Sequence, residues 1–406
     1  LFILSAPQGS PMYQARRTIH WLFMAVLLVP LTLHAAVLEG FYQVAVPATE
    51  GQDRSQALRE AAQLMVTRQA GSDALGNDAV QAAMQDPRPL MSRIAGTEAG
   101  GVQVEFEPAA LRDLLTEAGL SVLGPNRPAV MLWAVENKVL GPELLSQGGE
   151  WTEALSEAAR ARAVALSLPL ADLEDRTLVD VKAIEQADEQ TLKQASQRYD
   201  ASAVLALTIS ETTDESVLEW AWWLNEQSES GRITAESRAA AADQLMLEIA
   251  DLVVEQYGVT PSTSVESSQW QIVVDGVDSV GEFAGLQRTL QQLGSKRAPR
   301  VLSVKGGEVR LALDFPGSEE QLERLLALDQ RMRRMPAPEP ELALFSQSGP
   351  DSDTGAVDEP TGPGIDGAAA NDADTLPEPA MEPSEQMVEE LAAPEPTANI
   401  MYFRLR

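Results

Sequence analysis

Three short apolar segments decide the predicted fold: Ala129–Val135 (AVMLWAV), Ala163–Leu170 (AVALSLPL) and Ala201–Ile209 (ASAVLALTI). Each is too short for a buried helix, and its Val, Leu and Ala content favours a strand covered on both faces. Helical patterns separate the segments, at Trp151–Ala165 and Gln190–Tyr199. Because a parallel pair of strands needs a crossover of about a dozen residues, this order predicts a central α/β module with a parallel sheet, over residues 126–260.

A smaller module is predicted on each side of the central one. Residues 37–125 combine strand and helix patterns and predict an N-terminal αβ module. Residues 268–330 have the order β-α-β-β-α, which lacks one strand of the ferredoxin-like βαββαβ arrangement. The chain ends in the apolar segment 400–406, which we expect to return as the missing fourth strand; the alternative is a frayed terminus.

A long segment between the third module and this last strand has an unusual composition. Residues 336–399 contain fifteen acidic residues, eleven prolines and no Lys or Arg. Such a sequence buries too little apolar surface to offset the entropy of ordering it. We therefore predict a disordered acidic linker, and an α+β or α/β fold class for the ordered modules.

The start of the chain resembles a secretory leader. Met12 is the natural first residue, Arg16 and Arg17 follow, and an apolar stretch then ends in small residues. A basic start, a short apolar stretch and small residues describe a cleaved signal peptide, here residues 1–36. The stretch is shorter than the roughly 20 residues of a membrane span. We expect a periplasmic protein without a membrane span after cleavage, or one held by an N-terminal anchor if the leader is retained.

Charge and composition exclude several classes of function. The chain carries a formal net charge of −31, which argues against nucleic-acid binding and against attachment to anionic lipid. Its two histidines, His20 and His34, lie in the predicted leader, and it contains no cysteine. The exported chain therefore has no Ser-His-Asp or Cys-His catalysis, no thiol chemistry and no ordinary zinc or copper site. We expect no cofactor, and we assign no catalytic residue.

Acidic residues follow the predicted parallel strands, at the sheet edge where ligands tend to bind. The candidates for a partner-binding or ligand-binding rim are Glu136, Asp172, Glu174 and Asp175. One hypothesis is a carboxylate cluster for Mg²⁺, Ca²⁺ or a cationic partner surface. The other is structural, with Asp172 and Asp175 capping a turn and a helix and the remaining side chains in solvent.

Two tryptophans of the segment Val217–Leu224 complete the candidate rim. Strand alternation places Trp220 and Trp222 on one face and Trp223 on the other. An exposed pair of rings would bind sugar or peptide, and a buried pair would pack a helix against the sheet.

An ordered set of short segments resembles a known family. The resemblance runs from about Val37 to Leu328 and rests on Leu38–Tyr42 (LEGFY), Ala57–Ala61 (ALREA), Arg127-Pro128, Leu132-Trp133, Leu168–Leu173 (LPLADL) and Arg198–Ala201 (RYDA). It is to an uncharacterised family of exported gammaproteobacterial proteins, domain of unknown function 2066. The resemblance implies an envelope protein of unassigned activity and supplies no active residues. The chain departs from the family pattern at Arg68-Gln69-Ala70-Gly71.

Two classes of function remain for this sequence. The preferred hypothesis is a non-enzymatic periplasmic protein that binds another envelope component. The alternative is a carboxylate-only hydrolase, resembling a glycosidase, that acts on an envelope glycan with two acids about 5–10 Å apart. The oligomeric state is left open.

Overall fold

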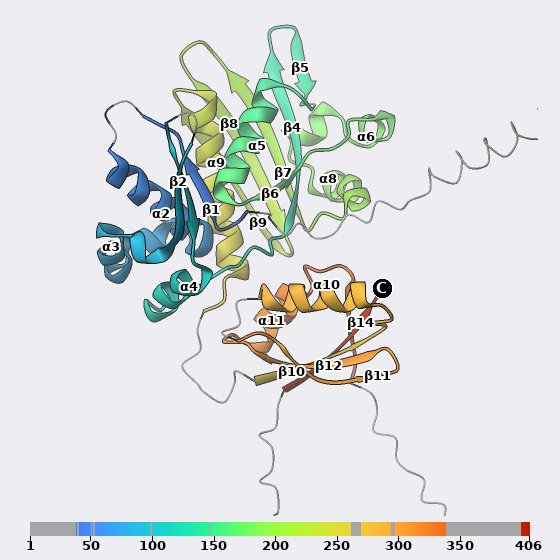
Figure 1. The fold of residues 1–406 in the computed structure, drawn as a ribbon. Coiled ribbons are helices and arrows are strands. Elements are labelled where there is room, and N and C mark those ends of the chain that lie inside the picture. The colour runs from blue at the N-terminus through green and yellow to red at the C-terminus, as the bar shows by residue number, and fades with distance from the viewer. Residues whose placement is uncertain are drawn as a thin grey trace, which may run out of the picture. The chain divides into compact units, whose positions relative to one another are not determined.

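The computed structural model describes residues 38–337 and 399–406, apart from residues 39, 50, 52, 98, 99, 146, 261–268 and 294–296. These residues form three β-sheets with helices packed on them (Figure 1), which confirms the predicted mixture of α and β structure. The predicted leader and nearly all of the predicted acidic linker lie outside the described residues. None of the described helices combines the length and apolar character that a bilayer span requires.

The N-terminal module is a three-stranded antiparallel sheet with helices. The sheet order is β1-β3-β2, from β1 (Gln43–Val46), β2 (Met91–Gly96) and β3 (Val102–Phe106). Asp53 caps the start of α2 by accepting the N–H of Gln56 at 2.7 Å, as its sequence position predicts. The helices of this module are α2 (Arg54–Ala70), η1 (Ser72–Gly76), α3 (Asp78–Gln85), η2 (Arg88–Leu90) and α4 (Pro108–Glu117).

The central module is a mixed sheet in the order β5-β4-β7-β8-β9, with β6 also paired to β4. The predicted parallel pairing is confirmed for β4 with β6 and with β7, whereas hairpins add β5, β8 and β9 antiparallel. The strands are β4 (Ala129–Lys138), β5 (Gly141–Leu144), β6 (Ala165–Ser167), β7 (Ala203–Glu211), β8 (Ser216–Leu224) and β9 (Gln227–Ala235).

Helices cover both faces of this central sheet. On one face α5 (Glu150–Arg162) and α9 (Arg238–Tyr257) pack over Val130, Leu132 and Ala134 of β4. On the other face α7 (Val181–Glu185) and α8 (Glu189–Ser196) pack over the alternate β4 side chains, including Trp133. Burial on both sides explains why β4 is apolar throughout its first half. The short elements α6 (Leu173–Leu178) and η3 (Gln197–Tyr199) flank α7 and α8 in sequence.

The third module contains a five-stranded sheet in the order β11-β12-β10-β14-β13. Two helices, α10 and α11, connect its strands in the order β-α-β-β-α-β before the final strand β14 (Figure 1). Its elements are β10 (Gln269–Asp275), α10 (Val280–Gln291), β11 (Arg300–Lys305), β12 (Glu308–Asp314), α11 (Glu319–Leu326), β13 (Met332–Met335) and β14 (Asn399–Leu405).

The last strand joins this sheet, as predicted, but not as the fourth strand of a ferredoxin-like unit. That strand is β13, beyond the predicted module boundary at residue 330. A fourth strand of a ferredoxin-like unit runs antiparallel to the first, whereas β14 runs parallel to β10 and lies between β10 and β13. The sequence hides β13 because Met332-Arg333-Arg334-Met335 has only two apolar side chains.

Gly231 allows a close approach between strands β8 and β9. It lies opposite Trp220, and a Cβ atom built on Gly231 would lie 2.7 Å from the indole ring. An indole has no flexible end that can move aside, so the ring or the strand would have to shift. A small residue is required here because the large ring occupies the neighbouring space.

We predict that Gly231→Ala lowers the free energy of unfolding by about 1–3 kcal/mol, the usual cost of overpacking. Urea unfolding followed by circular dichroism measures it. Gly96→Ala in β2 is the matched control, because a Cβ there meets no atom within 4 Å. Equal stability of the two variants would contradict the predicted clash.

Candidate functional site

Three of the four predicted rim carboxylates converge on one arginine. Arg198 in η3 lies 2.9 Å from Asp172, 3.1 Å from Asp175 and 3.3 Å from Glu174, measured from guanidinium nitrogen to carboxylate oxygen. We call these four residues the Arg198 cluster. Glu136 is not a member, since it pairs with Lys138 at 3.3 Å at the end of β4.

The Arg198 cluster has an evident structural role. Asp172 caps α6 by accepting the N–H of Asp175 at 3.0 Å. Asp175 is fully buried and also accepts the hydroxyl of Tyr199 at 2.6 Å. No group of three or more His, Cys, Asp or Glu side chains in the described part of the chain is arranged to hold a metal ion. The geometry therefore matches the capping hypothesis for Asp172.

Electrostatics in the Arg198 cluster follow from these contacts. The hydrogen bonds from Arg198 lower the pKa of Asp172 to about 2. Burial, and then the hydrogen bond to Asp175, raise the pKa of the Tyr199 hydroxyl to about 12. At neutral pH Asp172 is thus a carboxylate, Arg198 is a charged guanidinium, and the neighbouring Tyr199 is a neutral phenol.

The two rim tryptophans form no exposed platform, which corrects that hypothesis. Trp222 is 1% exposed and Trp220 is 8% exposed, and both belong to the core beneath α9. Their alternation on β8 was predicted correctly, with Trp223 on the opposite face. The face they share is covered because α9 packs on it.

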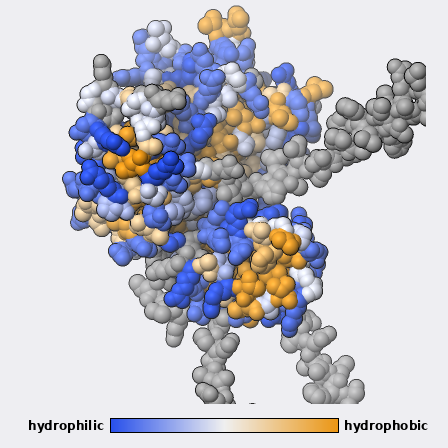
Figure 2. Space-filling view, in the orientation of Figure 1, coloured by the Kyte–Doolittle hydropathy of each residue, from blue (hydrophilic) through white to orange (hydrophobic). Residues whose placement is uncertain are grey.

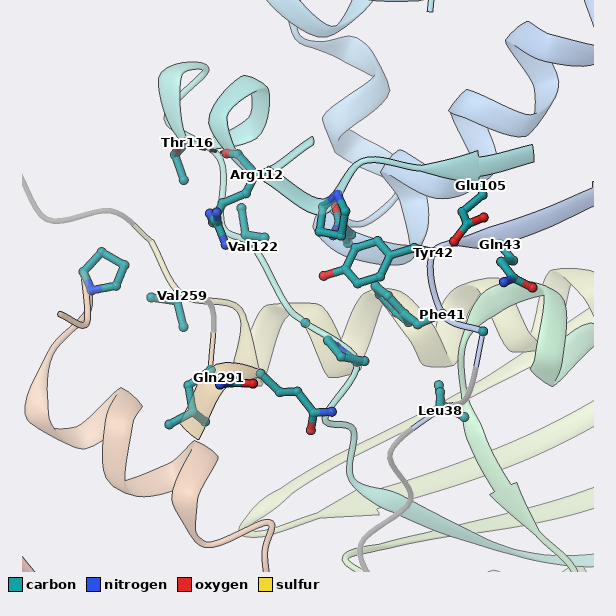
Figure 3. Close-up of a pocket in the computed structure, with 18 residues that line it drawn as sticks. Leu38, Phe41, Tyr42, Gln43, Glu105, Arg112, Thr116, Val122, Val259 and Gln291 are labelled. Atoms are coloured by element: carbon teal, nitrogen blue, oxygen red, sulfur yellow. Dashed lines mark hydrogen bonds between the residues drawn. The ribbon is translucent and has the colours of Figure 1, made fainter. Parts of the chain in front are cut away.

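A cavity of about 450 Å³ lies beside the turn that precedes β1. Figure 3 shows the side chains of Phe41 and Tyr42 in the middle of this cavity, with Arg112 and Val122 on one side and Gln43 and Glu105 on the other. We call it the tyrosine pocket. Its other polar lining residues are Gln69, Thr116, Gln291 and Gln292.

Gln69 at the end of α2 is the most constrained polar residue of the tyrosine pocket. It is 1% exposed, and its side chain hydrogen-bonds Tyr42, which lowers the pKa of that phenol. The larger effect on Tyr42 is burial, and the net result is a raised pKa. The carbonyl oxygen of the Gln69 side chain, Oε1, is buried and has no hydrogen-bond partner among the described residues.

A buried arginine packs against the turn that contains Phe41 and Tyr42, which we call the aromatic turn. Arg127 is 1% exposed, and its guanidinium carbon lies 5.2 Å from the centre of the Phe41 ring. It donates to the backbone carbonyls of Gly124 (2.9 Å) and Arg68, and it forms no ion pair with a carboxylate of the described residues. Burial lowers the pKa of Arg127 to about 9, so the side chain stays charged at neutral pH.

The tyrosine pocket could not be predicted from the sequence, although some of its residues lie in or beside the segments that carry the family resemblance. Phe41 and Tyr42 belong to the LEGFY segment, and Gln69 lies where the chain departs from the family pattern. No short motif joins them, because the lining residues come from positions 38 to 316. The one available signal was a polar Arg68-Gln69 pair on the apolar stripe of α2.

A second, larger cavity of about 710 Å³ is lined by several acidic side chains. We call it the acidic cleft. Its lining includes no Lys or Arg among the described residues, and its acids are Asp73, Glu229, Glu248, Asp251 and Glu255. Asp251 is already engaged, since it accepts the N–H and the hydroxyl of Ser72 at 2.8 and 2.6 Å.

Comparisons with known proteins give a family match and similarities to solved structures. The model of a domain of unknown function (DUF8605) matches residues 35–124, which include most residues of the tyrosine pocket. The fold is similar to the LpoB C-terminal domain from Salmonella enterica, at 14% identity over 27% of this chain and 84% of that chain, with a TM-score of 0.16. A competence-damaged protein (CinA) superfamily protein from Enterobacter cloacae matches at 14% identity over 36% and 88%, with a TM-score of 0.18.

The family match bears on the N-terminal module alone. It supports an uncharacterised family for residues 35–124, while the resemblance to domain of unknown function 2066 stays a prediction. No curated protein matches the sequence. Structural similarity at these identities and TM-scores assigns no function.

We predict that Arg198→Met makes the protein less stable at neutral pH and removes part of its acid sensitivity. Because folding lowers the pKa of Asp172, this carboxylate stabilises the folded protein at pH values above its ordinary pKa of 3.8. The stabilisation is lost as the pH falls toward 2. The melting temperature of the variant should lie several degrees below that of the unaltered protein from pH 8 to 5. The difference should shrink below pH 4.

Arg232→Met is the matched control for this experiment. It removes the exposed Arg232–Glu219 pair of 3.0 Å, and exposed pairs contribute little. Melting temperatures measured by calorimetry across the pH range test both variants. If the melting temperature of Arg198→Met stays below that of the unaltered protein by a constant amount down to pH 2, the stabilising pairing of Arg198 with Asp172 is contradicted.

Proposed function

We propose that the protein is an exported, non-enzymatic binding protein of the cell envelope and that its ligand occupies the tyrosine pocket. The observation that carries the proposal is the unpaired Oε1 of Gln69 in the pocket lining. A buried amide oxygen without a partner costs about 1–3 kcal/mol. A ligand that donates an N–H or O–H to this oxygen recovers that free energy.

The lining defines the chemistry of the ligand. Side-chain amides come from Gln43, Gln69, Gln291 and Gln292, and apolar contact comes from Phe41, Tyr42, Val122 and several prolines. Arg112 and Glu105 carry opposite charges, so the lining selects for neither sign. We infer an uncharged polar group with one apolar face, such as an N-acetylated sugar of an envelope glycan, which combines hydroxyl and amide donors with a flat ring face.

The carboxylates favour binding over hydrolysis in this pocket. A glycosidase needs a pair of acids about 5–10 Å apart, and Glu105 is the one acid among the described lining residues. The hydrolase alternative would have its acids in the acidic cleft instead. Periplasmic location, which follows from the predicted leader, is part of the proposal.

We expect soluble peptidoglycan fragments to bind the full chain and Gln69→Leu to weaken that binding about 3- to 10-fold, the value of one neutral hydrogen bond. Isothermal titration calorimetry measures the affinity. Tyr42→Phe should weaken it by a similar factor, because it removes the hydroxyl beside Gln69.

Gln63→Leu is the matched control, since Gln63 is an exposed glutamine on the same helix α2. Equal affinity of the Gln69 and Gln63 variants would place the ligand elsewhere. Cleavage of the fragments during the titration, lost in Glu229→Gln or Glu248→Gln, would favour the hydrolase alternative.

The proposed envelope partner has a separate candidate surface. The turn between β4 and β5 presents two aliphatic side chains, Val139 and Leu140, with exposures of 105% and 97%. Figure 2 shows an apolar group at the tip of this hairpin. Fully exposed neighbouring aliphatic residues are costly to hydrate, and they stabilise a complex when a partner covers them.

We predict that the double change Val139→Ser and Leu140→Ser leaves the melting temperature unchanged and reduces capture of an envelope protein from a periplasmic extract. The turn contributes nothing to the core, so stability should not respond. Quantitative mass spectrometry of the captured proteins provides the measurement, with Val301→Ser as a control that alters a partly exposed residue of the third module. Identical capture by both variants would remove this surface from the proposal.

A further inference from the structure

The final strand occupies a slot between two other strands of the third module. β14 pairs parallel with β10 along six residue pairs and antiparallel with β13 along four. Met401, Phe403 and Leu405 point into the core and are at most 7% exposed. We call the space between β10 and β13 the strand slot.

The third module depends on this strand for its sheet. In the described part of the chain, β13 pairs with β14 alone, and β14 separates it from β10. Removing β14 would leave two open strand edges and an uncovered apolar core. Open edges of this kind pair readily with another strand.

The connection to β14 is far longer than its geometry requires. β13 and β14 are antiparallel neighbours, and Met335 lies opposite Tyr402, so a turn of two to five residues would join them. Instead, the 63 residues 336–398 lie between them. Effective concentration falls roughly as the −3/2 power of connection length, so a connection of this length lowers it about 60-fold relative to a four-residue turn.

We propose that the strand slot also accepts β14 from a second copy of the chain, which gives a strand-exchanged dimer. Every contact of the closed chain re-forms between copies. These include the 2.8 Å pair of Arg404 with Asp275 and the stacking of Arg334 on Phe403 at 5.4 Å. The closed monomer and the strand-exchanged dimer then differ mainly in whether the connection returns β14 to its own sheet. The length of the connection weakens the entropic preference for the closed monomer.

The net charge of the chain determines how strand exchange between copies depends on ionic strength. Each copy has a formal net charge of −31, and repulsion between the copies opposes their approach at low ionic strength. Salt screens this repulsion. The dimer fraction therefore rises with both protein concentration and salt, whereas closure within one chain does not depend on protein concentration.

The absence of cysteine permits a direct test with the full chain. Arg333 and Arg404 are exposed and opposite each other on β13 and β14, at a separation that suits a disulfide. A ¹⁵N-labelled Arg333→Cys chain is mixed with an unlabelled Arg404→Cys chain, each at about 0.5 mM, near the effective concentrations of linked segments. Mild urea is added to release β14 from the strand slot, and the mixture is then returned to buffer and oxidised.

The expected result is a mixed disulfide dimer, identified by its isotope mass, whose yield rises with salt. The double variant Arg333→Cys with Arg404→Cys should close an internal disulfide when oxidised in dilute solution, which shows that the positions are competent. Arg232→Cys, at an exposed position outside the strand slot, is mixed with Arg404→Cys and reports random collision. A mixed dimer no more abundant than in that control, while the double variant closes internally, would overturn the proposal.

Discussion

The arrangement of the first two modules depends on one buried arginine. Arg68, near the end of α2, donates to the carbonyl of Phe41 (3.1 Å) before β1 and to that of Gln43 (2.8 Å) at the start of β1. It also donates to the carbonyl of Ala161 (2.6 Å) at the end of α5. The guanidinium is planar with donors in fixed directions, so it fixes the aromatic turn relative to both helices. The carbonyls at the end of α5 carry the partial negative charge of a helix C-terminus, which suits a buried cation.

Features that depend on local pattern could be predicted from the sequence. β4 and β7 followed from continuous apolar runs, and β8 followed from its alternation. These signals are strong because each residue's role is set by neighbours within a few positions. The fold class and the parallel pairing of β4 with β7 could thus be predicted without coordinates.

Features set by distant partners could not be predicted. The acids of the Arg198 cluster follow a strand as rim residues would, but they pair with an arginine more than twenty positions away. The tyrosine pocket joins residues from the first module to the third. β13 carries two arginines in four residues, so its pattern resembles a loop. In each case the deciding contact is long-range, and a single sequence does not reveal it.

The buried arginines also determine what the tyrosine pocket presents to a ligand. Arg68 and Arg127 donate to backbone carbonyls, which accept hydrogen bonds without cancelling the charge. Arg127 and Arg112 therefore lower the pKa of Tyr42, but burial raises it more, and the phenol stays protonated at neutral pH. The side chain of Gln69 hydrogen-bonds this protonated phenol. The pocket thus offers a donor on Tyr42 beside an acceptor on Gln69, an arrangement that matches an amide or a hydroxyl better than an ion.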